Sequence, residues 1–330
     1  MITIDTHLLE PLCRPGAGEA VARAVAPHLG MQMRARQIDT PRRIAHFLAQ
    51  IAHESDGFAT LEEYGDGRHY EGRADLGNTR TGDGARFRGR GLIQLTGRAN
   101  YRRMGARLGL DLESEPERAA TPQTAAAIAC AYWQSRDINA HADRDDLVAV
   151  TFAVNGGLNG LADRRHRLDC ITPVLGPDLF GPPAPQPVLR TGDRGPAVAS
   201  LQHALAEAGE ALTVDGIFGP ATNAAVKRVQ DRAGLDPTGL ADEPLRRVLA
   251  SRAGTGDNRF MPLVKRSLSL AGHRTSLSLE PEFWDEVEHA AEADGRSLAG
   301  LIADIDAARG DEPLASSVRV WVLQRLRADR

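Results

Sequence analysis

The carboxylates near residue 54 are the groups in this sequence best suited to acid–base chemistry. Glu54 follows His53 in the phrase IAHESDGF, and Glu62, Glu63 and Glu71 come soon after it. Hydrolysis of a glycosidic bond needs two carboxyl groups beside a cleft, one protonated to assist the leaving group and one ionised to activate water. Acidic residues are also common on protein surfaces, so the cluster alone leaves a solvated helix end as an alternative.

A zinc site is a second alternative, because His46 and His53 lie seven residues apart on one predicted helical face. Together with Glu54 they could supply three ligands. The phrase HESDG lacks the second histidine of the HExxH motif, however. We therefore expect no metal and no other cofactor at this position.

The surrounding pattern predicts helices that would bring these residues to a cleft. A capping residue and a proline at Thr40 and Pro41 begin an apolar stripe that should end near His53 and Glu54. Further apolar helices are predicted over residues 122–135 and 147–154. The glycine-rich stretch of residues 65–97 between the first two helices has too little apolar content for a core. Such loops on a helical scaffold often carry function.

The run RFRGRGLIQLTGRANY over residues 86–101 adds amide and hydroxyl groups suited to binding sugars. Together with AHES-GF, LGNT--GDG and the later NGG, it resembles the family-19 glycoside hydrolases, the chitinase-like enzymes of plants and phage endolysins. The resemblance covers about residues 40–175 and keeps the order and spacing of the endolysin motifs.

This resemblance implies that Glu54 is the general acid. It also implies that His53 supports the acid and that Tyr101 packs beneath the sugar cleft. The residues that it implies line the cleft are Gln94, Thr96, Asn100 and Asn155. For the base we predict Glu63, where endolysin relatives carry a second glutamate, with Glu71 as the rival and Glu62 as a surface residue. The resemblance also implies an inverting mechanism, for which we expect the two carboxyl groups to be about 6.5–9.5 Å apart.

Two linkers predict three domains, at residues 1–180, 188–250 and 260–330. The first linker is the proline-rich GPPAPQP of residues 181–187, and the second is the polar segment of residues 251–259. The expected fold class is mainly α, beginning with a lysozyme-like α+β hydrolase domain. The middle segment resembles the three-helix peptidoglycan-binding module through VASLQHAL, VDGIFGPAT and AAVKRVQ, so peptidoglycan is the expected partner.

The last segment resembles a ribbon-helix-helix domain, with one strand predicted at residues 274–280 followed by three helical phrases. A lone strand would leave an unpaired edge, which favours a homodimer through this domain. The resemblance also raises DNA binding. Nine basic residues against twelve acidic ones in 260–330, a net charge of −3, argue against strong affinity for nucleic acid.

The sequence as a whole is that of a soluble, modular protein. Its formal net charge is −4, and no apolar run is long enough to span a membrane. The first residues lack the pattern of a signal peptide, so we expect synthesis in the cytoplasm and action on the cell wall after release. The favoured function is an endolysin-type peptidoglycan hydrolase. The alternatives are a chitinase, or a DNA-binding regulator with a vestigial hydrolase domain.

Overall fold

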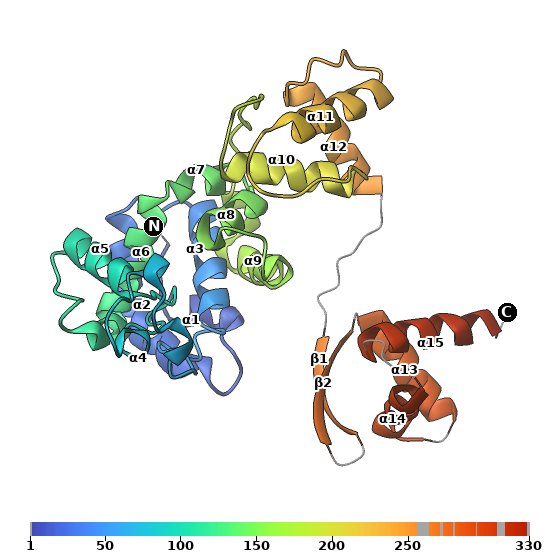
Figure 1. Ribbon diagram of the computed structural model, residues 1–330, viewed down its shortest axis with the longest axis horizontal. Helices are drawn as coiled ribbons and strands as arrows, with labels where there is room; N and C mark the ends of the chain where they lie inside the picture. The colour runs from blue at the N-terminus through green and yellow to red at the C-terminus, as the bar shows by residue number, and fades with distance from the viewer. Residues whose placement is uncertain are drawn as a thin grey trace. The chain divides into compact units, whose positions relative to one another are not determined.

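The structure is a computed structural model that describes residues 2–255, 264–270, 273–279, 281–294, 296–308 and 314–328. The chain divides into two compact units, Met1–Asp257 and Asn258–Arg330. The chain is mainly helical, as predicted (Figure 1). No helix in the described part of the chain is both long and apolar enough to cross a bilayer.

The first part of this unit, within residues 2–180, was predicted as the hydrolase domain and is called the hydrolase part below; it is built from short helices around a shared core. They are α1 (Thr6–Leu9), α2 (Gly18–Arg34), α3 (Pro41–Glu54), α4 (Asp83–Arg86), α5 (Arg98–Leu108), α6 (Pro122–Ser135), α7 (Ile138–Asp143), α8 (Leu147–Asn155) and α9 (Leu161–Leu175). The predicted α+β character is reduced, within residues 2–180, to isolated bridges of Arg90 with Glu62 and with Leu95. The domain is therefore almost purely helical where it is described.

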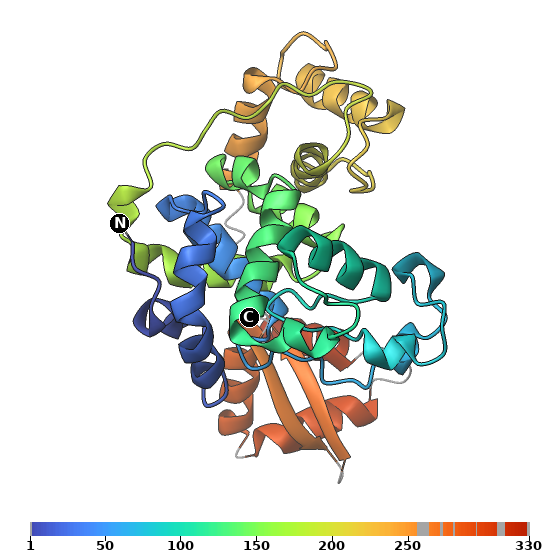
Figure 2. The ribbon, with the colours of Figure 1, turned by 90° about the vertical axis from the view of Figure 1, so that its left-hand side faces the viewer.

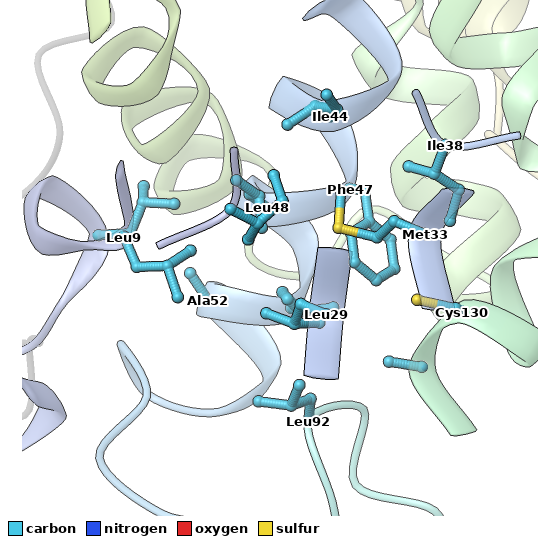
Figure 3. Close-up of a cluster of buried hydrophobic side chains, with 14 of the residues drawn as sticks. Leu9, Leu29, Met33, Ile38, Ile44, Phe47, Leu48, Ala52, Leu92 and Cys130 are labelled. Carbon is cyan, nitrogen blue, oxygen red and sulfur yellow. The ribbon is translucent and has the colours of Figure 1, made fainter. Parts of the chain in front are cut away.

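Helix α3 is the central element of this unit and follows the predicted bounds. The Thr40 hydroxyl accepts the Arg43 amide at 3.3 Å, and Pro41 occupies the first turn. Ile44, Phe47 and Leu48 are buried in the main core, which Figure 3 shows together with side chains from α2 and α6. Burial of this face fixes α3, and its last residue is Glu54.

The glycine-rich stretch contributes more to the core than the sequence suggested. Phe87 and Leu92 are fully buried and Leu95 is nearly so. Phe87 packs against the Tyr101 ring at 5.3 Å and beneath the Arg98 guanidinium at 4.6 Å. The expectation that residues 65–97 lie outside any core was therefore wrong, because a few aromatic and aliphatic anchors hold the loop down.

Three helices form the module that follows: α10 (Pro196–Glu207), α11 (Pro220–Arg232) and α12 (Glu243–Thr255). Its buried glutamines each hold a turn. Gln202 accepts the Gly216 amide at 2.8 Å, and Gln230 accepts the Gly239 amide at 3.0 Å. Because α12 extends to Thr255, the predicted second linker begins inside a helix, and its residues 256–259 lie outside the described residues.

The module packs directly on the hydrolase helices. Helix α10 lies against α8, where the Ser200 hydroxyl donates to Asp146 Oδ1 at 2.7 Å (Figure 1). A side chain at Gly216 would meet the Phe152 ring, since its Cβ would lie 3.0 Å from Cζ. The first linker is also held, because Arg42 Nη2 donates to the Gly181 carbonyl at 2.8 Å. The module is thus docked within one unit with the hydrolase part.

The second unit is a hairpin with three helices on one side of it, as Figures 1 and 2 show. It consists of β1 (Val264–Leu270), β2 (His273–Leu279), α13 (Pro281–Ala293), α14 (Leu298–Ala308) and α15 (Leu314–Ala328). Strand β1 pairs antiparallel with β2, from Val264 opposite Leu279 to Leu270 opposite His273. Leu277, Trp284 and Val318 are among its buried core residues.

This hairpin corrects one step of the sequence argument. The strand of residues 274–280 was expected alone and in need of a partner from a second copy. Instead β1 supplies a partner strand within the chain. The strand of residues 274–280 is therefore not the unpaired strand on which the homodimer argument rested. Self-association through this unit stays a prediction.

Candidate active site

Glu54 closes α3 and meets an arginine from α9. Arg164 Nη2 donates to Glu54 Oε1 at 2.5 Å, and Arg164 Nη1 donates to the buried amide oxygen of Gln50. The Arg164 side chain is 1% exposed, whereas that of Glu54 is 23% exposed. Glu54 thus reaches the surface from a buried, charge-assisted anchor that fixes the orientation of its carboxyl group.

His53 makes a second contact between the same two helices. Its Nδ1 lies 2.6 Å from Asp163 Oδ2, and its ring packs on the backbone of Gly160, where an added Cβ would clash at 2.3 Å. Burial alone would raise the pKa of Asp163, but hydrogen bonds from His53 and Arg167 lower that pKa to about 2. His53 therefore holds the start of α9, from which Arg164 extends toward Glu54.

Glu63 is held across a short bridge-like pairing with the loop of residues 86–101. Its backbone amide donates to the Gly89 carbonyl at 2.9 Å, and its Oε2 accepts the Gly89 amide at 2.9 Å. The Tyr70 hydroxyl donates to Glu63 Oε1 at 3.2 Å. Burial first, and then the Glu63 charge, raise the pKa of Tyr70, so this phenol remains a donor to the carboxylate.

Gln94 approaches Glu63 above the same glycine. A Cβ on Gly89 would lie 2.7 Å from Gln94 Oε1 and 3.1 Å from Glu63 Oε2, so the two oxygens converge where only glycine leaves room. Gln94 adopts a left-handed backbone with φ of 51°, a strained state for a non-glycine residue. Its Nε2 donates to the Gly91 carbonyl at 3.0 Å, which points the amide oxygen toward Glu63.

A groove of about 490 Å³ continues from Gln94 and includes two other predicted cleft residues, Thr96 and Asn100. The Thr96 hydroxyl donates to the Gln94 carbonyl at 2.8 Å, and Asn100 Nδ2 donates to the Thr96 carbonyl at 2.8 Å. Tyr132 also lines the groove, and its pKa is raised by burial first and also by the charge of Glu54. Gln94 and Tyr132 thus connect the groove to the surroundings of Glu63 and Glu54, but neither carboxylate is among the described residues that line it.

Tyr101 is the predicted cleft residue that the structure buries in the core. It is fully buried, donates to the Arg88 carbonyl at 2.8 Å and accepts Arg90 Nη1 at 3.2 Å. Burial raises the pKa of Tyr101 to about 12. In this structure Tyr101 supports the loop from within the core, and its predicted role at the substrate cleft stays a prediction.

The other two carboxylates serve the loop. Glu71 accepts the Gly82 amide at 2.7 Å and the Gly84 amide at 2.8 Å, so both of its oxygens hold the start of α4. Glu62 pairs with Arg88 at 2.8 Å and Arg90 at 3.1 Å. Its pKa is lowered by the Arg88 hydrogen bond first, against burial, and then by Arg90. Glu63, by contrast, has an oxygen beside Gln94 of the groove, which favours it over Glu71.

The remaining predicted residues lie at the edges. Asn155 is exposed at the end of α8, where its Nδ2 donates to the Asn159 carbonyl at 3.3 Å. His46 is fully buried and its Nε2 lies 2.8 Å from Asp145, whereas His53 lies beside Asp163. The two histidines of the zinc alternative thus contact different carboxylates.

Two functional candidates were missed from the sequence, Arg164 and Tyr70. Arg164 follows Glu54 by more than a hundred positions, in a helix that the apolar pattern did not predict, and Tyr70 lies in a loop with no periodic signal. Only the fold brings Arg164 to Glu54 and Tyr70 to Glu63. Each candidate carboxylate thus has a donor that orients it, as acid–base chemistry at a glycosidic bond requires.

Comparison with known proteins identifies the family. Residues 19–150 match the family model of class I chitinases. A glycosyl hydrolase family 19 domain-containing protein of Haemophilus influenzae is 32% identical over 151 residues, which cover 36% of this chain and 74% of that protein. The chain therefore belongs to glycoside hydrolase family 19.

Other relatives match shorter or more distant parts. An endochitinase of Arabidopsis thaliana is 36% identical over 118 residues, or 35% of this chain, and the chain spans only 40% of that protein. Chitinase C of Streptomyces griseus HUT6037 is a solved structure with 22% identity and a TM-score of 0.43, over 53% of this chain and 77% of that one. Residues 194–249 match a peptidoglycan binding domain, and residues 263–326 match a ribbon-helix-helix domain.

Proposed function

We propose that this family-19 glycoside hydrolase is an endolysin-type enzyme that cleaves the β-1,4 glycosidic bonds of peptidoglycan. The support for this substrate is the peptidoglycan-binding module, which packs on helix α8 of the hydrolase part. A module that binds the wall raises the local concentration of glycan at the cleft. The hydrolysis is an inverting single displacement.

The observation that carries the mechanism is the convergence of Glu63 Oε2 and Gln94 Oε1 over Gly89. Both oxygens are hydrogen-bond acceptors, and a water molecule has two hydrogens to donate. Glu63 then acts as the general base, and Gln94 orients the water that it activates. Glu54, oriented by Arg164, acts as the general acid that protonates the leaving oxygen.

A chitinase is the second candidate, because several similar proteins are endochitinases. Chitin is a neutral polymer of N-acetylglucosamine, whereas peptidoglycan alternates that sugar with one bearing a lactyl group. Rates on chitin oligomers and on purified murein separate the two functions. A DNA-binding role for the second unit is the third candidate, and a gel shift by the full chain at physiological salt is its test.

The test of the proposed function compares murein hydrolysis by the wild type, Glu54→Gln and Glu63→Gln, with Glu71→Gln as the matched control. We expect a loss of about 10²-fold or more in kcat for the first two variants and little change for the third. Mass spectrometry of the released ends identifies the bond that is cut. Full activity of a folded Glu54→Gln protein would exclude Glu54 as the acid.

We also propose, from the resemblance of the motifs to those of phage endolysins, that the protein accumulates in the cytoplasm and reaches the wall through a separate pore-forming protein. Expression with and without such a pore-forming protein tests this release. Lysis of cells that express this chain alone would contradict it. Sedimentation of the full chain tests the predicted homodimer, and a monomer at micromolar concentration would exclude it.

A further inference from the structure

The groove that Gln94, Thr96 and Asn100 line is cationic. Three of its lining side chains are arginines, Arg103, Arg107 and Arg136, and no aspartate or glutamate is among the described residues that line it. The whole chain, by contrast, has a formal net charge of −4. The positive charge of the groove is therefore local, and a concave site with charge of one sign attracts ligands of the opposite sign.

The spacing of two of these arginines directs them to the same side as the sugar-binding candidates. Asn100, Arg103 and Arg107 follow one another at intervals of three and four residues on helix α5, so they share one face of it. All three line the groove together with Gln94 and Thr96. Cationic groups and sugar-binding amides thus form one continuous surface.

The ion pairs of neighbouring arginines set these three apart. Arg98 pairs with Asp83 and Glu113, and Arg102 pairs with Glu113 at 2.6 Å. Within the described part of the chain, no carboxylate forms an ion pair with any of the three groove arginines. Ion pairs therefore neutralise the charges of Arg98 and Arg102, whereas the charges of the groove arginines remain available to a ligand.

Contacts within the protein fix the Arg136 side chain without any ligand. Its guanidinium lies 4.5 Å from the centre of the Tyr132 ring, and its Nη1 donates to the Ala153 carbonyl at 3.1 Å. Because the ring and the carbonyl fix the planar group, less freedom is lost when a carboxylate binds it. Arg103 makes a long contact of 3.5 Å to Asn100 Oδ1, which connects it to the amide side of the groove.

We propose that Arg103, Arg107 and Arg136 recognise carboxylates carried by the glycan, so that the groove selects an anionic strand over a neutral one. This inference rests on the proposed function and specifies its substrate class. In peptidoglycan the carboxylates come from two sources, the lactyl group once its peptide is removed and the peptide itself. Arginine binds both in the same way, through paired N–H donors to the two carboxylate oxygens.

The experiment measures kcat/KM of the full chain on three murein substrates. The first is intact sacculi, whose peptides carry carboxylates. The second is peptide-free strands prepared with an amidase, whose lactyl carboxylates are free. The third is the same peptide-free strands after their carboxylates have been converted to methylamides.

The variants are the double substitution Arg103→Gln/Arg107→Gln, the single substitution Arg136→Gln, and Arg103→Lys/Arg107→Lys, which keeps the charge. Arg23→Gln is the matched control, because Arg23 is exposed on α2 and lies outside the groove. Thermal unfolding of each variant checks that the fold is retained.

We expect the glutamine double variant to lower kcat/KM on a carboxylate-bearing substrate about tenfold more than on methylamidated strands, mainly through KM. The lysine variant should recover part of this loss. A selective loss on peptide-free strands identifies the lactyl carboxylate as the ligand, whereas a loss confined to sacculi identifies the peptide.

Two failures are distinguishable. An equal loss on charged and methylamidated strands, in an enzyme that still cuts murein, would overturn the inference and leave the proposed function intact. A wild type that cuts chitin oligomers but none of the murein substrates would overturn the proposed function, and the inference with it.

Discussion

Arg164 holds Glu54 through a contact of 2.5 Å between Nη2 and Oε1, made across the packed helices α3 and α9. The same guanidinium also donates to Gln50, one turn earlier on α3. Because both acceptors depend on one planar group, whose geometry an ammonium does not reproduce, we expect Arg164→Lys to lower kcat by about 10²-fold, a size typical of one lost donor in an active site. Steady-state kinetics on murein is the measurement.

The control for this prediction is Arg165→Lys. Arg165 is the next residue of α9 and is exposed, so its substitution should leave kcat unchanged. We also expect Arg164→Lys to lower the free energy of unfolding by about 1–3 kcal/mol, because Gln50 is left without its donor in a buried position. A variant that loses stability but keeps its kcat would show that Arg164 is structural only.

Gly89 provides a second test of the site. Its missing side chain leaves space for Glu63 and Gln94, and a methyl group there would lie 2.7 Å from Gln94 Oε1. We expect Gly89→Ala to displace the amide and to lower kcat at least about tenfold, since small displacements of catalytic groups are costly. Gly219→Ala is the control, because a Cβ at Gly219 meets no atom within 4 Å. Equal activities of the two variants would contradict the predicted role of this glycine.

The sequence predicted those parts of the site that local patterns encode. A cap at Thr40 and an apolar stripe give α3 and therefore the place of Glu54, and the compact run of residues 86–101 contains Gln94, Thr96 and Asn100. These features depend on neighbours in the chain, so periodicity and motif are sufficient to find them.

Periodicity and motifs could not predict contacts between segments that are distant in the sequence. Arg164 is far from Glu54 in sequence, and the burial of Tyr101 depends on Phe87 and on the packing of the whole loop. The hairpin was also missed, because Val264–Leu270 lacks a strict alternation of apolar and polar residues at its start. In each case tertiary packing determined the structure, and no local sequence pattern indicates it.

The pH dependence of stability offers a third prediction. The pKa of Asp163 is lowered in the folded chain from its ordinary value of 3.8 to about 2, so the ionised form favours folding. Its contribution is complete above about pH 4 and is lost as the pH falls toward 2. We expect urea unfolding of Asp163→Asn to show a weaker dependence on pH in this window than the wild type.

Asp178→Asn gives the comparison for that experiment, since Asp178 is an exposed acid in the turn after α9. Glu113, whose pKa is also lowered to about 2 by Arg102 and Arg98, remains in both variants and supplies a common background. If Asp163→Asn and Asp178→Asn have the same pH profile, the pair of His53 and Asp163 does not stabilise the fold.

The packing of the module on α8 leads to the last prediction. Phe152 lies beneath Gly216 of the module, and the same helix ends at Asn155 of the predicted cleft. Removing the ring should lower the stability of the docked arrangement by about 1–3 kcal/mol, less than a full core truncation because Phe152 is only partly buried. We therefore expect Phe152→Ala to speed proteolytic cleavage within the linker of residues 181–187, whose carbonyl at Gly181 is otherwise held by Arg42. Val174→Ala, at a position that is 43% exposed on α9, should leave the cleavage rate unchanged. Identical rates for Phe152→Ala and the wild type would mean that the linker and the Ser200–Asp146 hydrogen bond fix the module without the ring.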